Sequence, residues 1–185
     1  MRVALFTRWP EPGQAKTRLI PAIGGEAAAA LHKRLTERTI AVVHAAGLAL
    51  EIRSTGAPIA SFQEWLGQGT RIIDQGTGDL GQRLARAAQS LPVLLLGADI
   101  PDLAPHHLTA AAEALATNPA VIGPAEDGGY WLLGLATPAP QLFENMPWGT
   151  ETVFETTSSR LTNPVLLPVL ADLDRPEDLP RWPNL

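Results

Sequence analysis

A run of apolar residues, Val93–Leu96, leads into Gly97-Ala98 and then to two acids, Asp99 and Asp102. A short continuous apolar run indicates a strand that is buried on both faces of a parallel sheet. Residues that follow such a strand lie at the carboxyl edge, where open α/β sheets bind their ligands. Carboxylates bind Mg²⁺ or Mn²⁺ while diphosphate and water fill the remaining positions, so we interpret Asp99 as a divalent-metal ligand. For Asp102 we favour a structural role in a turn or helix cap.

A second candidate site is the segment Arg8–Arg18, which comes directly after the first expected strand. Gly13 gives the backbone freedom, Lys16 supplies a point charge and Arg18 supplies a bidentate fork, and such groups bind phosphate. In a doubly wound sheet a nucleotide lies at this position. The spacing is not that of a Walker A loop. A solvated basic loop is therefore the alternative interpretation.

A third candidate site is the segment Glu126–Trp131, in which Asp127, Gly128 and Gly129 precede an aromatic pair. Two glycines between an acid and aromatic rings let the backbone approach a ligand, with the rings as a wall. A hairpin turn, in which Asp-Gly is common, is equally compatible with this segment.

A fourth candidate site is the segment Asp172–Leu179. Alternation places Asp172 and Asp174 on the same side of an extended stretch, and Pro176 can start a helical turn. Acids at the start of a helix are also favoured by the helix dipole. That explanation suits the acids that follow Pro176 better than it suits Asp174.

Other chemistries find less support. The four histidines have no spacing that pairs with a carboxylate cluster, and we interpret them as helix-surface residues: His32, His44, His106 and His107. No Gly-x-Ser-x-Gly elbow is present, which argues against a Ser-His-Asp nucleophile. The glycines of Gly76–Gly81 lie too far along the chain for the first turn of a dinucleotide-binding fold.

Strands that alternate with helices predict a mostly parallel α/β sheet. The expected strands are Val3–Phe6, Leu48–Arg53, Arg71–Ile73, Val93–Leu96, Ala120–Ile122, Tyr130–Leu135 and Val165–Leu167. The expected helical segments are Glu26–Ala46, Ser61–Trp65, Leu80–Gln89, Leu108–Ala116, Thr150–Leu161 and Pro176–Leu179. Thr7–Pro21 is expected to be a long polar loop, and loops of this length are often functional.

Composition limits the class of protein. The 185 residues suit one domain, 1–185, and the net charge of −5 argues against nucleic acid or an anionic membrane as a partner. No apolar run approaches the roughly 20 residues of a bilayer span, and the N-terminus resembles a strand rather than a signal peptide. The chain has no cysteine, which excludes disulfides and thiolate zinc sites. We take the cytoplasm as the default location.

Five motifs occur in order along almost the whole chain. They are Phe6-x-Arg8-x-Pro10-x-Pro12-Gly13-x-x-Lys16-Thr17-Arg18-Leu19, Gly78-Asp79-Leu80-Gly81-x-Arg83, Gly97-x-Asp99-x-Pro101-x-Leu103, Gly123-Pro124-x-x-Asp127-Gly128-Gly129-Tyr130-x-x-Leu133 and Trp148-x-Thr150. As a set they resemble the DUF2064 group of glycosyltransferase-like proteins, also called selenodomain-associated transferase 1 proteins. That group belongs to the nucleotide-diphospho-sugar transferase (GT-A) superfamily.

This resemblance implies a Rossmann-like three-layer α/β sandwich of the GT-A type, with a mostly parallel central sheet. It implies that Lys16 and Arg18 bind nucleotide phosphates, that Asp99 holds the metal, and that the Gly78–Gly81 turn lies near the base or ribose.

The segment Asp174–Leu179 resembles the Asp-Thr-Pro-Glu-Asp-Leu element of sugar and phospholactate nucleotidyltransferases, which implies that Asp174 is the second metal-side acid. Two departures accompany these resemblances. Arg175 stands where the nucleotidyltransferases usually have Thr. Glycosyltransferases usually carry Asp-x-Asp, whereas Asp99 is followed by Ile100-Pro101, an arrangement more similar to the nucleotidyltransferases.

We therefore expect a transferase that uses Mg²⁺ or Mn²⁺, a nucleotide or nucleotide-sugar donor and a small-molecule acceptor. The catalytic candidates are Asp99, Lys16 at the outer phosphate and Asp127 at the acceptor hydroxyl. The metal ligands are Asp99 and Asp174. The substrate-binding candidates are Arg8, Gly13, Lys16, Thr17, Arg18, Gly78, Asp79, Gly128 and Gly129. The alternatives are a nucleotidyltransferase that releases pyrophosphate and a non-catalytic nucleotide-binding domain.

Overall fold

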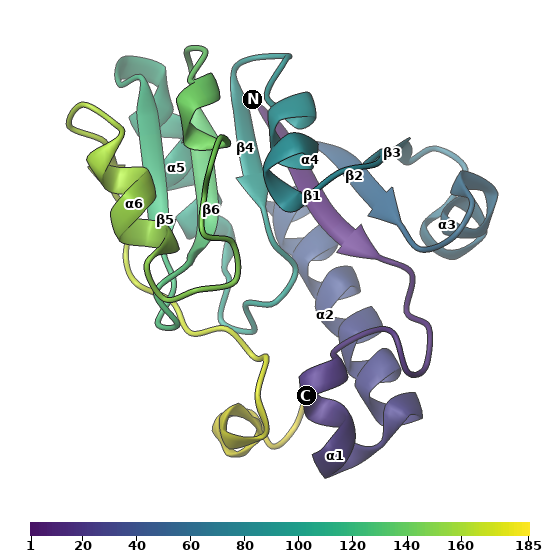
Figure 1. Ribbon diagram of the computed structural model, residues 1–185. Helices are drawn as coiled ribbons and strands as arrows, with labels where there is room; N and C mark the ends of the chain where they lie inside the picture. The colour runs from purple at the N-terminus through teal and green to yellow at the C-terminus, as the bar shows by residue number, and fades with distance from the viewer.

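A seven-stranded sheet forms the centre of the computed structural model, which describes residues 1–185 (Figure 1). Its strands are β1 (Arg2–Arg8), β2 (Ala49–Thr55), β3 (Arg71–Asp74), β4 (Val93–Leu96), β5 (Ala120–Pro124), β6 (Tyr130–Leu135) and β7 (Val165–Leu166). They lie in the order β3-β2-β1-β4-β6-β5-β7. Strand β6 is antiparallel to both of its neighbours and all other pairs are parallel. The predicted mostly parallel α/β sheet is confirmed.

Helices cover both faces of the sheet, which gives three layers. The α-helices are α1 (Ile20–Ile23), α2 (Gly25–Ala45), α3 (Ile59–Leu66), α4 (Leu80–Ala87), α5 (Pro105–Thr117) and α6 (Val153–Ser159). Short 3₁₀ helices are η1 (Thr17–Leu19), η2 (Pro140–Leu142) and η3 (Pro176–Arg181). In Figure 1, α2 lies behind the sheet and α4 in front of it. The predicted Rossmann-like sandwich is confirmed.

The apolar run of β4 is continuous because both faces of the strand are buried. Leu94 and Leu96 belong to the core cluster that includes residues of α2 and α5, whereas Val93 and Leu95 belong to the cluster that includes residues of α4. Successive side chains therefore enter opposite cores. The strand is parallel to β1 on one side, and the β5–β6 hairpin places β6 antiparallel to it on the other.

The expected loop Thr7–Pro21 is shorter than predicted. Strand β1 continues to Arg8, and the first helical residues begin at Thr17. Leu19 is fully buried against Leu31 and Leu35 of α2, and this packing draws the end of the segment into η1 and α1. Tertiary burial thus orders a stretch whose composition is that of a loop.

The C-terminal segment, Ala171–Leu185, crosses the carboxyl edge of the sheet, toward which β1, β2 and β4 point (Figure 1). Leu173 is buried in the same cluster as Leu19, and Leu179, Trp182 and Leu185 pack against it. The indole of Trp182 also donates to the Asp102 carboxylate at 3.1 Å. The favoured structural role of Asp102 is thus to hold the end of the chain rather than to cap a helix.

Away from this edge, toward the amino ends of the strands, Glu51 of β2 is buried among three arginines. Its carboxylate pairs with Arg2 at 2.6 Å, Arg53 at 2.7 Å and Arg71 at 2.9 Å. Burial alone would raise the pKa of Glu51, but the hydrogen bond from Arg71 and the charges of Arg53 and Arg2 outweigh it and hold the pKa below its usual value.

No helix is both long enough and apolar enough to cross a membrane.

Candidate active site

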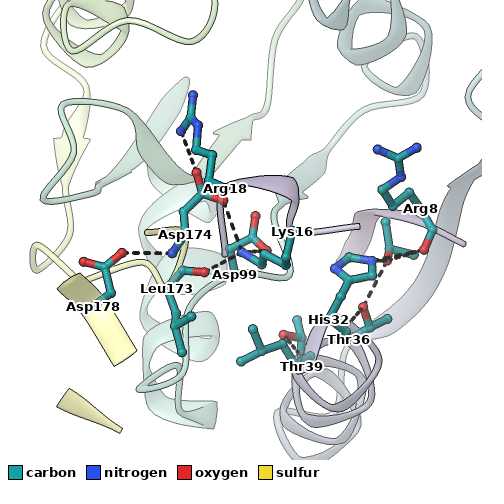
Figure 2. Close-up of polar contacts among 12 residues, drawn as sticks. Arg8, Lys16, Arg18, His32, Thr36, Thr39, Asp99, Leu173, Asp174 and Asp178 are labelled. Carbon is teal, nitrogen blue, oxygen red and sulfur yellow. Dashed lines mark hydrogen bonds and ion pairs between the residues drawn. The ribbon is translucent and has the colours of Figure 1, made fainter. Parts of the chain in front are cut away.

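Three segments that are far apart in the sequence meet at the Lys16 ammonium (Figure 2). Its Nζ lies 2.6 Å from Asp99 Oδ1 and 3.6 Å from Asp174 Oδ1, and it donates to the carbonyl oxygen of Leu173 at 2.5 Å. The Lys16 side chain is only 4% exposed, whereas those of Asp99 and Asp174 are 48% and 30% exposed. A buried cation therefore joins two carboxylates that remain open to solvent.

The local sequence explains how the two carboxylates arrive there. Asp99 follows β4 after Gly97-Ala98, at the carboxyl edge of the sheet. Leu173 is 1% exposed, and its N–H donates to the Asp99 carbonyl at 2.9 Å. In an extended segment the neighbours of an inward-pointing residue point outward. Burial of Leu173 thus turns Asp172 and Asp174 toward the cleft.

Arg18 and Asp178 fix Asp174 from two other directions (Figure 2). Arg18 donates to Asp174 Oδ2 at 2.6 Å while its side chain stays 55% exposed. Asp178 Oδ2 accepts from the backbone N–H groups of Asp174 at 3.0 Å and Arg175 at 2.7 Å. Asp178 therefore holds the turn before η3, as expected for an acid at a helix start.

The charges around Asp99 favour the ionised form of its carboxyl group. Desolvation opposes ionisation of Asp99, but the charge and hydrogen bond of Lys16, with help from His32, hold the pKa of Asp99 below its usual range. Asp172 behaves in the opposite way. Burial, and then the negative charges of Asp127, Asp178 and Asp174, raise the pKa of Asp172 to about 6, although its own backbone hydrogen bond opposes the rise.

A cleft of about 790 Å³ opens beside these residues, next to a smaller cavity of about 190 Å³. Arg18 lines the larger cleft and Asp99 lines the smaller cavity. The two share a wall made of Gly97, Asp127, Gly129, Tyr130, Trp131, Asp172 and Asp174. Concave sites of this size suit a small molecule or a cofactor.

The segment Asp127–Gly129 is both a hairpin turn and part of this wall. It joins β5 to β6, and Asp127 Oδ1 accepts from the Gly129 N–H at 2.8 Å. Gly128 has φ of 85°, and a Cβ atom there would lie 2.1 Å from the carbonyl oxygen of Glu151. The two interpretations of this segment are thus compatible, because the turn that needs glycine also faces the cleft.

Several predicted substrate-binding residues lie away from the cleft. The carboxylate of Asp79 accepts from the Gln82 N–H at 2.8 Å and caps α4, while the carbonyl of Gly78 accepts from Arg83 at 3.0 Å. Gly13 and Thr17 are exposed. Arg8 ends β1, and its Nε is buried without a hydrogen-bond partner. None of these five residues lines the cleft or the smaller cavity.

The interpretation of His32 as a helix-surface residue is wrong. His32 is 6% exposed, and its Nε2 lies 3.2 Å from Thr7 Oγ1 and 3.1 Å from the Arg8 carbonyl oxygen (Figure 2). Burial lowers the pKa of His32, although the charge of Asp99 and the hydrogen bond to Arg8 oppose this. The histidine tethers the end of β1 to α2. The signal available in the sequence was its helical spacing, three or four residues from Ala28 and Leu35, which are buried in α2.

Sequence reasoning placed Tyr130 and Asp172 in candidate segments but gave neither of them a role in the site. Tyr130 lines both cavities, and its hydroxyl is buried with no hydrogen-bond partner. Burial raises the pKa of Tyr130 far above its usual value, so the hydroxyl keeps its proton. The available signals were the place of Tyr130 next to Gly128-Gly129 and the alternation of Asp172 with Asp174.

Asp99 and Asp174 fit a divalent cation when a diphosphate supplies further ligands. No group of three or more His, Asp or Glu side chains is arranged to hold a metal by itself. The two carboxylates already share one cation, and both remain partly exposed. Mg²⁺ usually binds through one or two protein carboxylates, with waters and substrate phosphates completing its shell. The donor set is therefore suited to a metal that arrives with its phosphate ligand.

Comparison with known proteins identifies the family of the chain and structures of the same fold. The model of a family described as "Uncharacterized protein conserved in bacteria (DUF2064)" matches residues 36–150. No curated protein sequence matches the chain. A structure from Desulfovibrio desulfuricans, provisionally assigned as a nucleotide-diphospho-sugar transferase, has a TM-score of 0.86 and 29% identity, over 94% of this chain and 82% of that one.

Two more distant structures share the fold. Rv0371c of Mycobacterium tuberculosis, in complex with manganese, has a TM-score of 0.60 and 17% identity, over 97% of this chain and 96% of that one. Glucosyl-3-phosphoglycerate synthase of Mycobacterium tuberculosis, in complex with Mg²⁺ and uridine diphosphate, has a TM-score of 0.52 and 14% identity, over 96% of this chain and 72% of that one. The chain thus has a fold that occurs in nucleotide-dependent transferases.

Proposed function

The chain belongs to the DUF2064 family, and from that premise we propose that it is a metal-dependent transferase acting on a nucleotide-activated donor. The observation that carries the proposal is the approach of Asp99 and Asp174 to one buried ammonium beside a cleft of about 790 Å³. Arg18 adds an exposed guanidinium at the same place. Two carboxylates and a guanidinium can together bind a metal-complexed diphosphate.

The residues divide the work according to their exposure. Asp99 and Asp174 would hold Mg²⁺ or Mn²⁺, which when bound stabilises negative charge on phosphate oxygens as a Lewis acid. Arg18 is free to contact an outer phosphate, since only one of its nitrogens is used by Asp174. Lys16 is buried, so its ammonium holds the two carboxylates in position instead of reaching the phosphate. Asp127 faces both cavities and would orient an acceptor hydroxyl.

Glycosyl transfer is the leading form of this reaction. The acceptor hydroxyl oxygen forms a bond to the sugar carbon of the donor and loses its proton to the Asp127 carboxylate. The bond from that carbon to the diphosphate breaks, and the nucleoside diphosphate leaves with the bonding electron pair. Positioning and electrostatic stabilisation can carry such a step without a covalent intermediate on the protein. The similarity to the Desulfovibrio desulfuricans structure over 94% of the chain supports this form.

Nucleotidyl transfer is the second candidate, and the lone Asp99 favours it. Asp99 is followed by Ile100-Pro101 instead of completing an Asp-x-Asp pair. In this reaction the acceptor oxygen attacks the α-phosphorus of a nucleoside triphosphate and pyrophosphate leaves. Identification of the released product, nucleoside diphosphate or pyrophosphate, distinguishes the two forms.

The first experiment is a thermal-shift screen of nucleotides and nucleotide-sugars with and without Mn²⁺. A ligand at about 100 times its Kd stabilises the folded state by about 2.7 kcal/mol, which raises Tm by roughly 5–10 °C in a chain of this size. We expect a shift of this order for one nucleotide class, and only when metal is present.

Asp99→Asn tests the site, with Asp102→Asn as its matched control. The first variant should lose most of the metal-dependent shift and the product release, because it removes the carboxylate charge beside Lys16. The control changes an acid whose carboxylate accepts its hydrogen bonds from Trp182, away from Lys16, and it should keep both. Unchanged metal-dependent binding in Asp99→Asn, with no turnover by the wild type, would refute the proposal and leave a non-catalytic nucleotide-binding domain.

A further inference from the structure

The residues that line the cleft are of two chemical kinds, which we call its apolar wall and its acidic wall. The apolar wall includes Phe6 of β1, Leu80 and Leu84 of α4, and Trp148 and Val153 near the start of α6. Leu80 is 42% exposed, so a large apolar side chain faces open space. Phe6 and Trp148 pack against the core cluster that contains Leu84.

The acidic wall holds seven carboxylates and three arginines. The carboxylates are Glu126, Asp127, Glu151, Asp172, Asp174, Glu177 and Asp178, and the arginines are Arg18, Arg175 and Arg181. Glu126 is paired with Arg181 at 2.6 Å and Asp174 with Arg18 at 2.6 Å. The other five carboxylates form no ion pair with an arginine or lysine. This wall therefore has an excess of negative charge, which disfavours an anion that arrives without a metal ion, and its carboxylates accept hydrogen bonds from hydroxyl groups.

We propose that this cleft is the acceptor site and that the acceptor is a hydroxyl-bearing molecule with an apolar group and no negative charge. The inference rests on the proposed function, because it assigns the second substrate of the same reaction. The apolar group lies against Leu80, Leu84 and Trp148, and the hydroxyl groups face the acidic wall. The reacting hydroxyl is then close to Asp127 and to the donor phosphates at Arg18.

The test uses three small probes that differ in one property each. Hexyl β-D-glucoside carries hydroxyl groups and an apolar chain, methyl β-D-glucoside lacks the long chain, and hexyl β-D-glucuronide has a carboxylate in place of the C6 hydroxymethyl group. Each fully buried methylene contributes about fourfold in affinity, so even partial burial of the chain is measurable. In calorimetric titrations without metal, we expect the hexyl glucoside to bind at least tenfold more tightly than either other probe.

Leu80→Ala and Ile59→Ala provide matched variants. Both residues are the first of their helix, and they are 42% and 38% exposed, but only Leu80 lines the cleft. Leu80→Ala should weaken binding of the hexyl glucoside at least threefold, and Ile59→Ala should leave it unchanged. Equal or tighter binding of the glucuronide, or equal effects of the two variants, would overturn the inference.

A parallel titration with a nucleotide and Mn²⁺ separates this inference from the proposed function. If the nucleotide binds and no glucoside does, the acceptor inference falls while the transferase proposal stands. If the hexyl glucoside binds as expected and no nucleotide does, the ligand class of the cleft is supported while the transferase proposal falls.

Discussion

Replacement of Lys16 by Met should destabilise the protein and at the same time make it more responsive to divalent cations. The Lys16 ammonium contacts Asp99 at 2.6 Å, Asp174 at 3.6 Å and the Leu173 carbonyl at 2.5 Å. Met keeps much of the apolar stem but removes the charge. Asp99 would then lose its counter-ion and Asp174 would keep only Arg18, which lowers the free energy of unfolding.

The size of the effect follows from exposure. Removal of one partner from a fully buried ion pair costs about 3–5 kcal/mol. The side chains of Asp99 and Asp174 are 48% and 30% exposed, so solvent screens a large part of the remaining charge. We therefore expect a loss of about 2 kcal/mol, or a decrease in Tm of roughly 4–8 °C for a chain of this length.

Urea unfolding measures this loss, and its pH dependence identifies the cause. The pKa of Asp99 is held below its usual value of 3.8 in the folded state, so the pair stabilises the fold at higher pH and the effect disappears as the pH falls through the folded pKa. The difference between wild type and Lys16→Met should be constant above about pH 5 and shrink below about pH 4. Mn²⁺ should restore part of the lost stability.

Lys33→Met is the control, since Lys33 is the other lysine of the chain and is exposed, with its Nζ 5.9 Å from the Trp65 ring. It should change stability by less than about 0.5 kcal/mol. Equal losses in the two variants, or a Lys16→Met loss that is as large at pH 3 as at pH 7, would refute the reasoning.

Three further perturbations test other parts of the structure. Leu173→Ala should cost about 2–5 kcal/mol in urea unfolding because the residue is 1% exposed, and it should weaken metal-dependent nucleotide binding because the segment places Asp174; stability loss with unchanged binding would contradict this. Glu51→Gln should cost about 3 kcal/mol at pH 7 and less as the pH falls below the usual carboxyl pKa of 4.5, since the folded pKa is depressed; a loss independent of pH would exclude the ionic explanation. Asp79→Ala should cost about 1 kcal/mol through loss of the α4 cap and Asp79→Ser much less, whereas nucleotide binding that fails in both would show a ligand role for Asp79.

Much of the fold could be predicted because burial on two faces leaves a clear pattern. Val93–Leu96 is a strand with the predicted bounds, since its side chains alternate between two cores and all must be apolar. The direction of β6 could not be predicted in the same way. It depends on whether Asp127–Gly129 is a hairpin turn or a ligand loop, and the sequence is compatible with both.

Four residues that meet at the candidate site could be identified from the sequence, but their contacts could not. Asp99 was identified because it follows a buried strand, and Lys16, Arg18 and Asp174 through motifs. Insertion of Leu173 into the cluster around Leu19 decides that Lys16 meets the carboxylates. The hydrogen bond from Lys16 to the Leu173 carbonyl joins residues 157 positions apart, and no local pattern encodes it.

The charges of the assembled site bear on how a substrate would enter it. Asp99 and Asp174 carry two negative charges, and Lys16 and Arg18 carry two positive charges. The cluster is therefore close to neutral, and it attracts neither a free divalent cation nor a free diphosphate strongly. A cation complexed with a diphosphate offers complementary charge to both halves at once, so each component should favour binding of the other. This coupling is the physical reason to screen nucleotides together with Mn²⁺, and it follows from Lys16 being buried between the carboxylates rather than extended toward the phosphate.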